Sequence, residues 1–150
     1  MNRAKILVVE DNPLNMELVT DILEVHGYEV LQAGEAQTGI DMAVRNHPDL
    51  ILMDVQLPGM DGISAIKVLK GHTGTSTIPV VALTAHAMVG DREKAEAAGC
   101  NGYIVKPIDT RQFPKEVASF LILQGLLDGG AGFSRELENC SKTIPMRRSS

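Results

Sequence analysis

Aromatic residues are scarce in this sequence. Phe, Tyr and Trp make up 3% of the 150 residues, and tryptophan does not occur. Proteins that bind single-stranded nucleic acid use aromatic side chains as stacking surfaces, and binding to a phosphate backbone requires a basic surface. This chain instead has a net charge of −5. We therefore expect no direct nucleic-acid partner.

Long apolar runs and cysteine are also lacking. No stretch approaches the roughly 20 apolar residues that a membrane-spanning helix needs. The apolar run at residues 6–9 is followed at once by two acidic residues, unlike the apolar segment of a signal peptide. Cys100 and Cys140 lie far apart without metal-ligand spacing, which favours reduced thiols over a disulfide. These absences predict a cytoplasmic protein without membrane insertion.

What the sequence does contain is a regular alternation of strand and helix signals. The length suits one domain with a sizeable core. Short apolar runs predict five strands, and the segments between and after them have helical spacing, which predicts five helices. This alternation is typical of parallel βαβ units in a single three-layer α/β domain. The expected strands are 5–10, 28–33, 49–54, 78–84 and 102–106, and the expected helices are 11–27, 35–47, 62–70, 86–98 and 110–124.

The first helix has clear boundary signals. Asn12 can cap its first turn, Pro13 suits the first helical position, and Gly27 is placed to end it. The composition changes after Gln124, where glycines and scattered charges begin. We interpret residues 1–124 as the domain and 125–150 as a flexible tail, with a short helical turn around 134–139. A targeting or docking peptide is the alternative for the tail, supported by its basic end MRRSS.

Polar side chains follow the predicted strands where each strand ends. Glu10 and Asp11 end the first, Asp54 the third, Thr84 the fourth and Lys106 the fifth. Because ligand sites in such sheets lie at the carboxyl ends of the strands, we expect these side chains to converge. Three carboxylates repel one another, and Mg²⁺, which prefers oxygen ligands, relieves that repulsion. A lysine and a hydroxyl nearby make a site suited to phosphoryl transfer, and aspartate is a known phosphoryl acceptor.

Each of these residues also has an ordinary structural explanation. Asp11 fits a helix cap about as well as a metal ligand, and Thr84 can cap the helix that follows it. Lys106 can be a plain loop residue before proline. The joint pattern at the strand ends is what favours a functional site.

Four blocks of sequence carry a resemblance to a known family. ILVVEDN, LILMDVQLPGMDG, IPVVALTA and YIVKP resemble the signature blocks of response-regulator receiver domains, over about residues 3–124. The resemblance implies a doubly wound, flavodoxin-like (CheY-like) sheet of order 2-1-3-4-5 with five helices. The blocks LILMDVQLP, TAHAMVGD and AAGCNGYIVKPI look closest to DivK-type single-domain regulators, and are also similar to receivers of hybrid histidine kinases.

The resemblance also implies roles for individual residues. Asp54 matches the phosphoacceptor, which takes its phosphoryl group from a sensor histidine kinase or a histidine phosphotransfer protein. Glu10 and Asp11 match the acidic pair that binds Mg²⁺, together with Asp54 and the backbone carbonyl of Gln56. The chain is thus expected to be a signalling receiver that catalyses only its own phosphorylation and dephosphorylation.

A second group matches the residues that respond to phosphorylation. Thr84 and Lys106 match the hydroxyl and the cation that contact the phosphoryl oxygens, and a cis peptide is expected between Lys106 and Pro107. Tyr103 matches the aromatic residue that turns inward in the active state, and an ordinary surface tyrosine is the alternative. His86, like Gln56, matches a position where the family varies its dephosphorylation rate. The expected result is a surface that binds a downstream protein, on a monomer or weak dimer.

Three other assignments compete with this one. A haloacid-dehalogenase-type phosphatase needs a second acid two residues after its nucleophile, where this chain has Gln56. A flavodoxin-like FMN binder needs a phosphate-binding loop after the first strand, where EDNPLN is acidic. The third is a receiver fragment of a hybrid kinase or other multidomain regulator, against which we favour a stand-alone protein.

Overall fold

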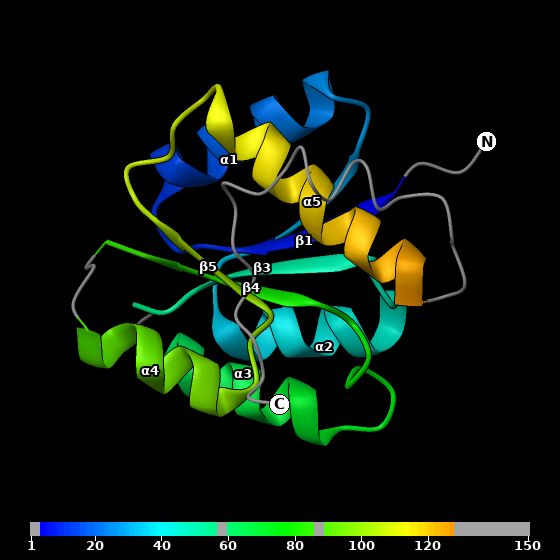
Figure 1. Ribbon diagram of the computed structural model, residues 1–150, viewed down its shortest axis with the longest axis vertical. Coiled ribbons are helices and arrows are strands. Elements are labelled where there is room, and N and C mark those ends of the chain that lie inside the picture. Colours follow the sequence, from blue (N-terminus) through cyan, green and yellow to red (C-terminus); the bar gives the residue numbers. More distant parts are fainter. Residues whose placement is uncertain (1–3, 57–59, 86–88, 128–150) are drawn as a thin grey trace.

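The chain forms a five-stranded parallel sheet with helices on both faces (Figure 1). The computed structural model describes residues 4–56, 60–85 and 89–127. The strand order is β2-β1-β3-β4-β5, which confirms the order that the receiver resemblance implies. The strands are β1 (Lys5–Val9), β2 (Glu29–Ala33), β3 (Leu50–Asp54), β4 (Val80–Thr84) and β5 (Gly102–Val105).

The five helices divide into two layers. Helices α1 and α5 cover one face of the sheet, and α2, α3 and α4 cover the other (Figure 1). None of the helices in the described part of the chain is long and apolar enough to cross a membrane. The helices are α1 (Pro13–Val25), α2 (Ala36–Asn46), α3 (Gly62–Gly71), α4 (Val89–Ala98) and α5 (Gln112–Leu127).

The strands at the centre of the sheet are buried on both faces. Every residue of β3 and β4 is buried, as are the last four of β1. Alternate side chains of β1 enter opposite cores: Leu7 and Val9 pack with α2, α3 and α4, whereas Ile6 and Val8 pack with α1 and α5. A strand covered on both sides has no polar face, which explains why these segments read as continuous apolar runs.

The boundaries of α1 follow the local signals. The side-chain oxygen of Asn12 accepts hydrogen bonds from the backbone N–H groups of Leu14 and Asn15, at 2.9 and 3.1 Å. Pro13 is the first helical residue, where its missing N–H costs nothing. Gly27, with φ of +90°, follows the helix in a conformation that favours glycine.

Two boundaries differ from the sequence-based expectation. Strand β4 begins at Val80 rather than residue 78, because Pro79 has no N–H to donate to the sheet. Helix α5 begins at Gln112 rather than Thr110, because residues 110 and 111 form a turn that leads into the helix. The Asp109 carboxylate caps this turn by accepting from the N–H groups of Arg111 and Gln112.

The end of α5 also differs. The helix continues through Gly125 to Leu127, so the first three residues of the expected tail belong to the domain. Residues 128–150, the rest of that tail, lie outside the described residues, as do residues 86–88 of the expected fourth helix.

Gly62 sets how closely α3 approaches the end of β3. Its N–H donates to the carbonyl of Val55 at 3.3 Å, and a Cβ at this position would overlap the backbone of Asp54 and Val55. Gly71, at the other end of the same helix, has open space where a Cβ would stand. Packing at the edge of the sheet therefore requires glycine at position 62 but not at position 71.

We expect Gly62→Ala to lower the free energy of unfolding by about 1–3 kcal/mol, because the helix must move away from β3. Gly71→Ala is the matched control and should be neutral or stabilising by up to about 1 kcal/mol. Urea denaturation measures both. Equal effects of the two substitutions would contradict the close approach at Gly62.

Candidate functional site

The carboxyl ends of four strands lie level with one another. In the sheet register Asp54 pairs with Leu83, and Thr84 pairs with Val105. Glu10 directly follows β1, and its N–H donates to the carbonyl of Ala33 at 3.0 Å. This register places the predicted site residues along one edge, the position where parallel sheets bind ligands.

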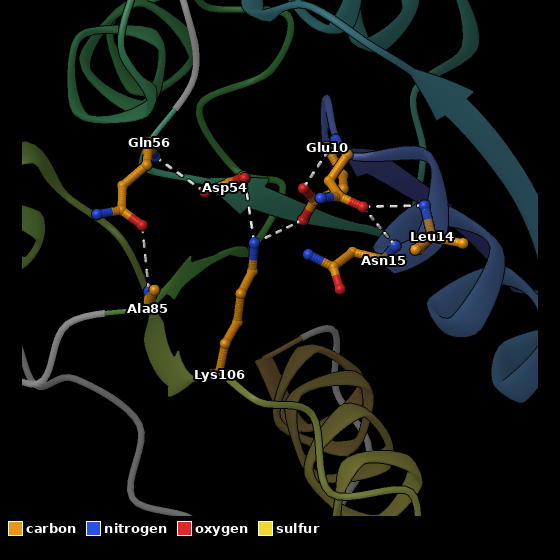
Figure 2. A network of polar contacts seen from close by, with 8 residues as sticks. Glu10, Leu14, Asn15, Asp54, Gln56, Ala85 and Lys106 are labelled. Atoms are coloured by element: carbon orange, nitrogen blue, oxygen red, sulfur yellow. Dashed lines mark hydrogen bonds and ion pairs between the residues drawn. The ribbon is translucent and has the colours of Figure 1, made fainter.

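Lys106 connects two of the predicted carboxylates (Figure 2). Its Nζ donates to Glu10 Oε1 at 2.8 Å and to Asp54 Oδ2 at 3.2 Å. The side chains of Glu10 and Asp54 are only 1% and 3% exposed, and that of Lys106 is 13% exposed. Charges buried this deeply are costly unless they are paired, so the three groups depend on one another.

The second oxygen of each carboxylate also has a partner. Glu10 Oε2 accepts from the N–H of Asn12 at 3.1 Å, and Asp54 Oδ1 accepts from the N–H of Gln56 at 2.9 Å (Figure 2). Both donors belong to backbone that leaves the strand end, so their positions are set by the fold. The Asp54 carboxylate is thereby held in a fixed orientation.

Burial and neighbouring groups both shift the pKa values of Glu10 and Lys106. Burial raises the pKa of Glu10 above its ordinary value, and the Asp54 charge adds to this, against the hydrogen bonds from Lys106 and Asn12, which lower it. For Lys106, burial acts to lower the pKa. The hydrogen bond to Glu10 and the negative charges of Asp54 and Glu10 outweigh it, so the pKa of Lys106 is raised and the amine stays charged.

Asp11 completes an acidic cluster at the rim of the site. Ligand oxygens of Glu10, Asp11 and Asp54 all lie within 4.8 Å of one another. Asp11 is exposed, whereas the other two are buried, so the cluster opens toward solvent on one side. An all-oxygen set with room for water fits a hard divalent cation such as Mg²⁺, which keeps several of its waters.

The remaining predicted residues lie around this centre. Thr84 is fully buried at the end of β4, and its carbonyl accepts from the N–H of Lys106 at 2.6 Å. The side-chain oxygen of Gln56 accepts from the N–H of Ala85 at 3.3 Å. Tyr103 is half-buried against the core on the α2, α3 and α4 side, and the Lys106–Pro107 peptide is cis. His86 lies outside the described residues.

Two hydrogen bonds of the site, each from a backbone N–H to a side-chain oxygen, were not predicted from the sequence. Asn12 was expected only to cap α1, yet its N–H also binds Glu10. The contact between Gln56 and Ala85 joins the loops after β3 and β4. The contact of Asn12 with Glu10 could have been predicted, because Asn12 directly follows the acidic pair Glu10 and Asp11. The second joins positions 29 residues apart and has no local signal.

The family assignment follows from comparison with known proteins. The model of the response regulator receiver domain matches residues 6–118. The chain belongs to the response regulator receiver domain family. This membership confirms the assignment made from the four sequence blocks, and it sets aside the phosphatase and flavodoxin alternatives.

The receiver is similar to two response regulators over nearly the whole length of those proteins. The polar-differentiation response regulator DivK of Brucella ovis is 44% identical over 116 residues, which cover 77% of this chain and 94% of that protein. The corresponding protein of Brucella anthropi is 43% identical over the same coverage.

Solved structures agree with the fold. A CheY-like receiver domain protein from Methanospirillum hungatei is 27% identical with a TM-score of 0.76, covering 83% of this chain and 98% of that one. The receiver domain of a sensor histidine kinase from Pseudomonas aeruginosa is 34% identical with a TM-score of 0.75, covering 80% and 98%. That structure has a magnesium ion coordinated in its active-site cleft.

Removing the charge of Lys106 should destabilise the receiver. In Lys106→Met the two buried carboxylates lose their cation, and we expect the free energy of unfolding to fall by about 3 kcal/mol. Urea denaturation in the presence of a chelator measures this without contribution from metal.

Lys115→Met is the control, because Lys115 is exposed on α5. Its effect should stay within about 0.5 kcal/mol. A loss no larger for Lys106→Met than for this control would show that the buried network does not stabilise the fold.

Proposed function

We propose that this receiver accepts a phosphoryl group on Asp54 from a phosphohistidine of a sensor histidine kinase or histidine phosphotransfer protein. The observation that carries the proposal is the Lys106 ammonium held between Glu10 and Asp54, beside the exposed Asp11. An oriented carboxylate, a fixed cation and an acidic cluster open to solvent are the parts that phosphoryl transfer requires.

The transfer uses one oxygen of Asp54 as the nucleophile. This oxygen forms a bond to phosphorus as the P–N bond of phosphohistidine breaks. The bonding electrons remain on the imidazole nitrogen of the donor, which takes up a proton. Gln56 holds the carboxylate through its N–H group, and Lys106 offsets the negative charge that gathers on the phosphoryl oxygens.

The acidic cluster has its own part in this chemistry. When bound, Mg²⁺ supplies positive charge that offsets the repulsion between the incoming phosphoryl group and the carboxylates. Glu10, Asp11, Asp54 and the backbone carbonyl of Gln56 are the groups that would hold it. The magnesium in the related Pseudomonas receiver supports this assignment.

The donor needs a docking surface beside the site. Leu14 is 76% exposed in the first turn of α1, and its N–H binds the Asn12 cap next to Glu10 (Figure 2). An apolar side chain this exposed at the edge of a reaction site suits contact with a partner protein. We assign the start of α1 to donor binding.

We favour a single-domain regulator of the DivK kind over a receiver that is part of a longer kinase. The support is the 44% identity to DivK over 94% of that protein. The similarity to a kinase receiver, at 34% identity, is the observation that keeps the second assignment open.

Asp54→Asn should abolish phosphorylation. A small phosphoramidate donor, which has the P–N bond of phosphohistidine, should add the mass of one phosphoryl group to the parent protein in the presence of Mg²⁺. The product should be labile to hydroxylamine, as an acyl phosphate is. Asp61→Asn is the control, because Asn can also cap α3, and it should react as the parent does. Labelling of Asp54→Asn at the parent rate would contradict the assignment.

Magnesium should stabilise the parent protein. At a concentration tenfold above its Kd the gain is about 1.4 kcal/mol, seen as a higher midpoint of thermal unfolding. Asp11→Ala should lose most of this rise, whereas Asp41→Ala, at an exposed position on α2, should keep it. An equal rise in both variants would place the cation elsewhere.

The structural change caused by phosphorylation should reach the surface of α4, β5 and α5 through Thr84. A phosphoryl group on Asp54 attracts the Thr84 hydroxyl, and movement of Thr84 leaves space that Tyr103 can enter. Helix α4 offers little resistance, because its buried residues include Ala95 and Ala98, which bury little apolar area each. The changed surface of α4, β5 and α5 would then bind the downstream protein.

Beryllofluoride with Mg²⁺ tests this transmission as a phosphoryl mimic. Amide shifts in NMR spectra should be large at residues 84–98 and 103–106 of the parent. Thr84→Ala should still be phosphorylated but lose most of the distant shifts, whereas Thr84→Ser, which keeps the hydroxyl, should retain them. Distant shifts of parent size in Thr84→Ala would rule out this route.

A further inference from the structure

The side chain of Gln56 joins two loops that flank the candidate site. Its Oε1 accepts a hydrogen bond from the backbone N–H of Ala85 at 3.3 Å, and the backbone N–H of Gln56 donates to Asp54 Oδ1 at 2.9 Å. Gln56 lies two residues after the end of β3, and Ala85 directly follows Thr84, the last residue of β4. One residue therefore contacts both the Asp54 carboxylate and the backbone that leaves β4.

The contact lies beside the carboxylate that would be phosphorylated. Figure 2 shows the Gln56 side chain beside Asp54, with its oxygen directed to the N–H of Ala85. Backbone pairing between β3 and β4 includes the N–H of Val55, which donates to the carbonyl of Leu83 at 2.9 Å. Beyond this pair, the Gln56 side chain continues the connection between the two strand ends.

A phosphoryl group on Asp54 needs hydrogen-bond donors at this place. It extends the side chain by an O–P bond and a P–O bond, and its oxygens are strong acceptors. Neighbouring strands lie about 4.8 Å apart, so an oxygen on the β4 side can reach the backbone N–H that follows Thr84. In the resting protein this N–H, which belongs to Ala85, donates to Gln56. The phosphoryl group and the Gln56 side chain therefore compete for one donor.

We propose that the Gln56 side chain is a latch on the resting conformation, which holds the N–H of Ala85 and releases it when Asp54 is phosphorylated. An anionic phosphoryl oxygen is a stronger acceptor than a neutral carboxamide oxygen, so it displaces Gln56 from this N–H. Phosphorylation nevertheless breaks the hydrogen bond of Gln56, and the latch therefore makes activation less favourable. Gln56 acts here as a positioning residue, and the proposal rests on the proposed phosphorylation of Asp54.

The latch acts on the peptide unit that joins Thr84 to Ala85. The carbonyl of this unit accepts from the N–H of Lys106 at 2.6 Å, and its N–H donates to Gln56 at 3.3 Å. Both polar atoms of the unit are thus held in the resting protein, next to a fully buried threonine side chain. Release of the N–H frees this unit to rotate, which lets Thr84 move toward the phosphoryl group. The latch therefore determines how readily Thr84 responds.

Amide hydrogen exchange of the full chain tests the latch in the resting protein, without a phosphoryl group. Gln56→Met keeps the length of the side chain but removes its amide oxygen. The Ala85 amide should then exchange about two- to fivefold faster, as expected for the loss of one exposed hydrogen bond. The Val55 amide, which donates to a backbone carbonyl of β4, should exchange as in the parent. Gln56→Glu keeps an acceptor oxygen at the same reach and should not increase the Ala85 rate.

Beryllofluoride binding at saturating Mg²⁺ tests whether the latch opposes activation. Because the phosphoryl mimic no longer has to displace the Gln56 oxygen, Gln56→Met should bind it about two- to fivefold more tightly than the parent, measured by NMR titration. Removing a residue that only supports the fold would not tighten binding. Gln37→Met is the matched control: Gln37 is exposed on α2 and donates to Asp41 of the same helix, so the affinity should stay at the parent value.

The outcomes separate the latch from the function on which it rests. If the parent does not bind beryllofluoride, or binds it no better than Asp54→Asn, the proposed function fails and the latch with it. If the parent binds it but Gln56→Met binds it equally or more weakly, the latch is refuted and the function of Asp54 stands. An equal gain in Gln37→Met, or an Ala85 amide that exchanges at the parent rate in Gln56→Met, would also refute the latch.

Discussion

The buried ion pairs of Lys106 are the interaction on which the functional edge of this protein depends. One ammonium contacts two carboxylates that are almost completely removed from solvent, and these come from the ends of β1 and β3. Isolated charges would not be tolerated there. Because the backbone N–H groups of Asn12 and Gln56 satisfy the other carboxylate oxygens, the whole edge is held in one arrangement. The Glu10 and Asp54 carboxylates thus already have a fixed orientation at the site that we propose for a cation and a phosphoryl group.

The parallel sheet makes this arrangement possible. Helices must cover both faces to connect strands that all run in the same direction, and this leaves only the strand ends for ligands. It also determines what is left exposed. Helix α1 begins beside Glu10 with its Asn12 cap, and its Leu14, Leu18 and Val25 are exposed in the described part of the chain. One element therefore connects the candidate site with the surface proposed for the phosphoryl donor.

Local signals in the sequence predicted much of the fold. The Asn12–Pro13 start of α1, the continuous apolar runs of β1, β3 and β4, and the alternation of strands and helices all appear in the structure. The start of β4 was misplaced because the apolar run begins before Pro79, which has no N–H to donate to the sheet, although its carbonyl accepts from the N–H of Ile51 at 3.0 Å. The start of α5 was misplaced because residues 110 and 111 form a turn, and its end was misplaced because the helix continues past Gly125 to Leu127.

The sequence by itself determined the class of the fold and the chemistry of the site. Apolar periodicity specifies which segments are strands, and the polar residues that end them specify a cluster of acids, a lysine and a hydroxyl. Only the tertiary structure decided that Lys106 pairs with Glu10 and Asp54, across 96 and 52 positions of the chain. The tertiary structure also decided the close approach of Gly62 to β3 and the exposure of Leu14, Leu18 and Val25 on α1. Periodicity assigns a side chain to a face, but the packing of distant elements decides which face is covered and which charge lies opposite.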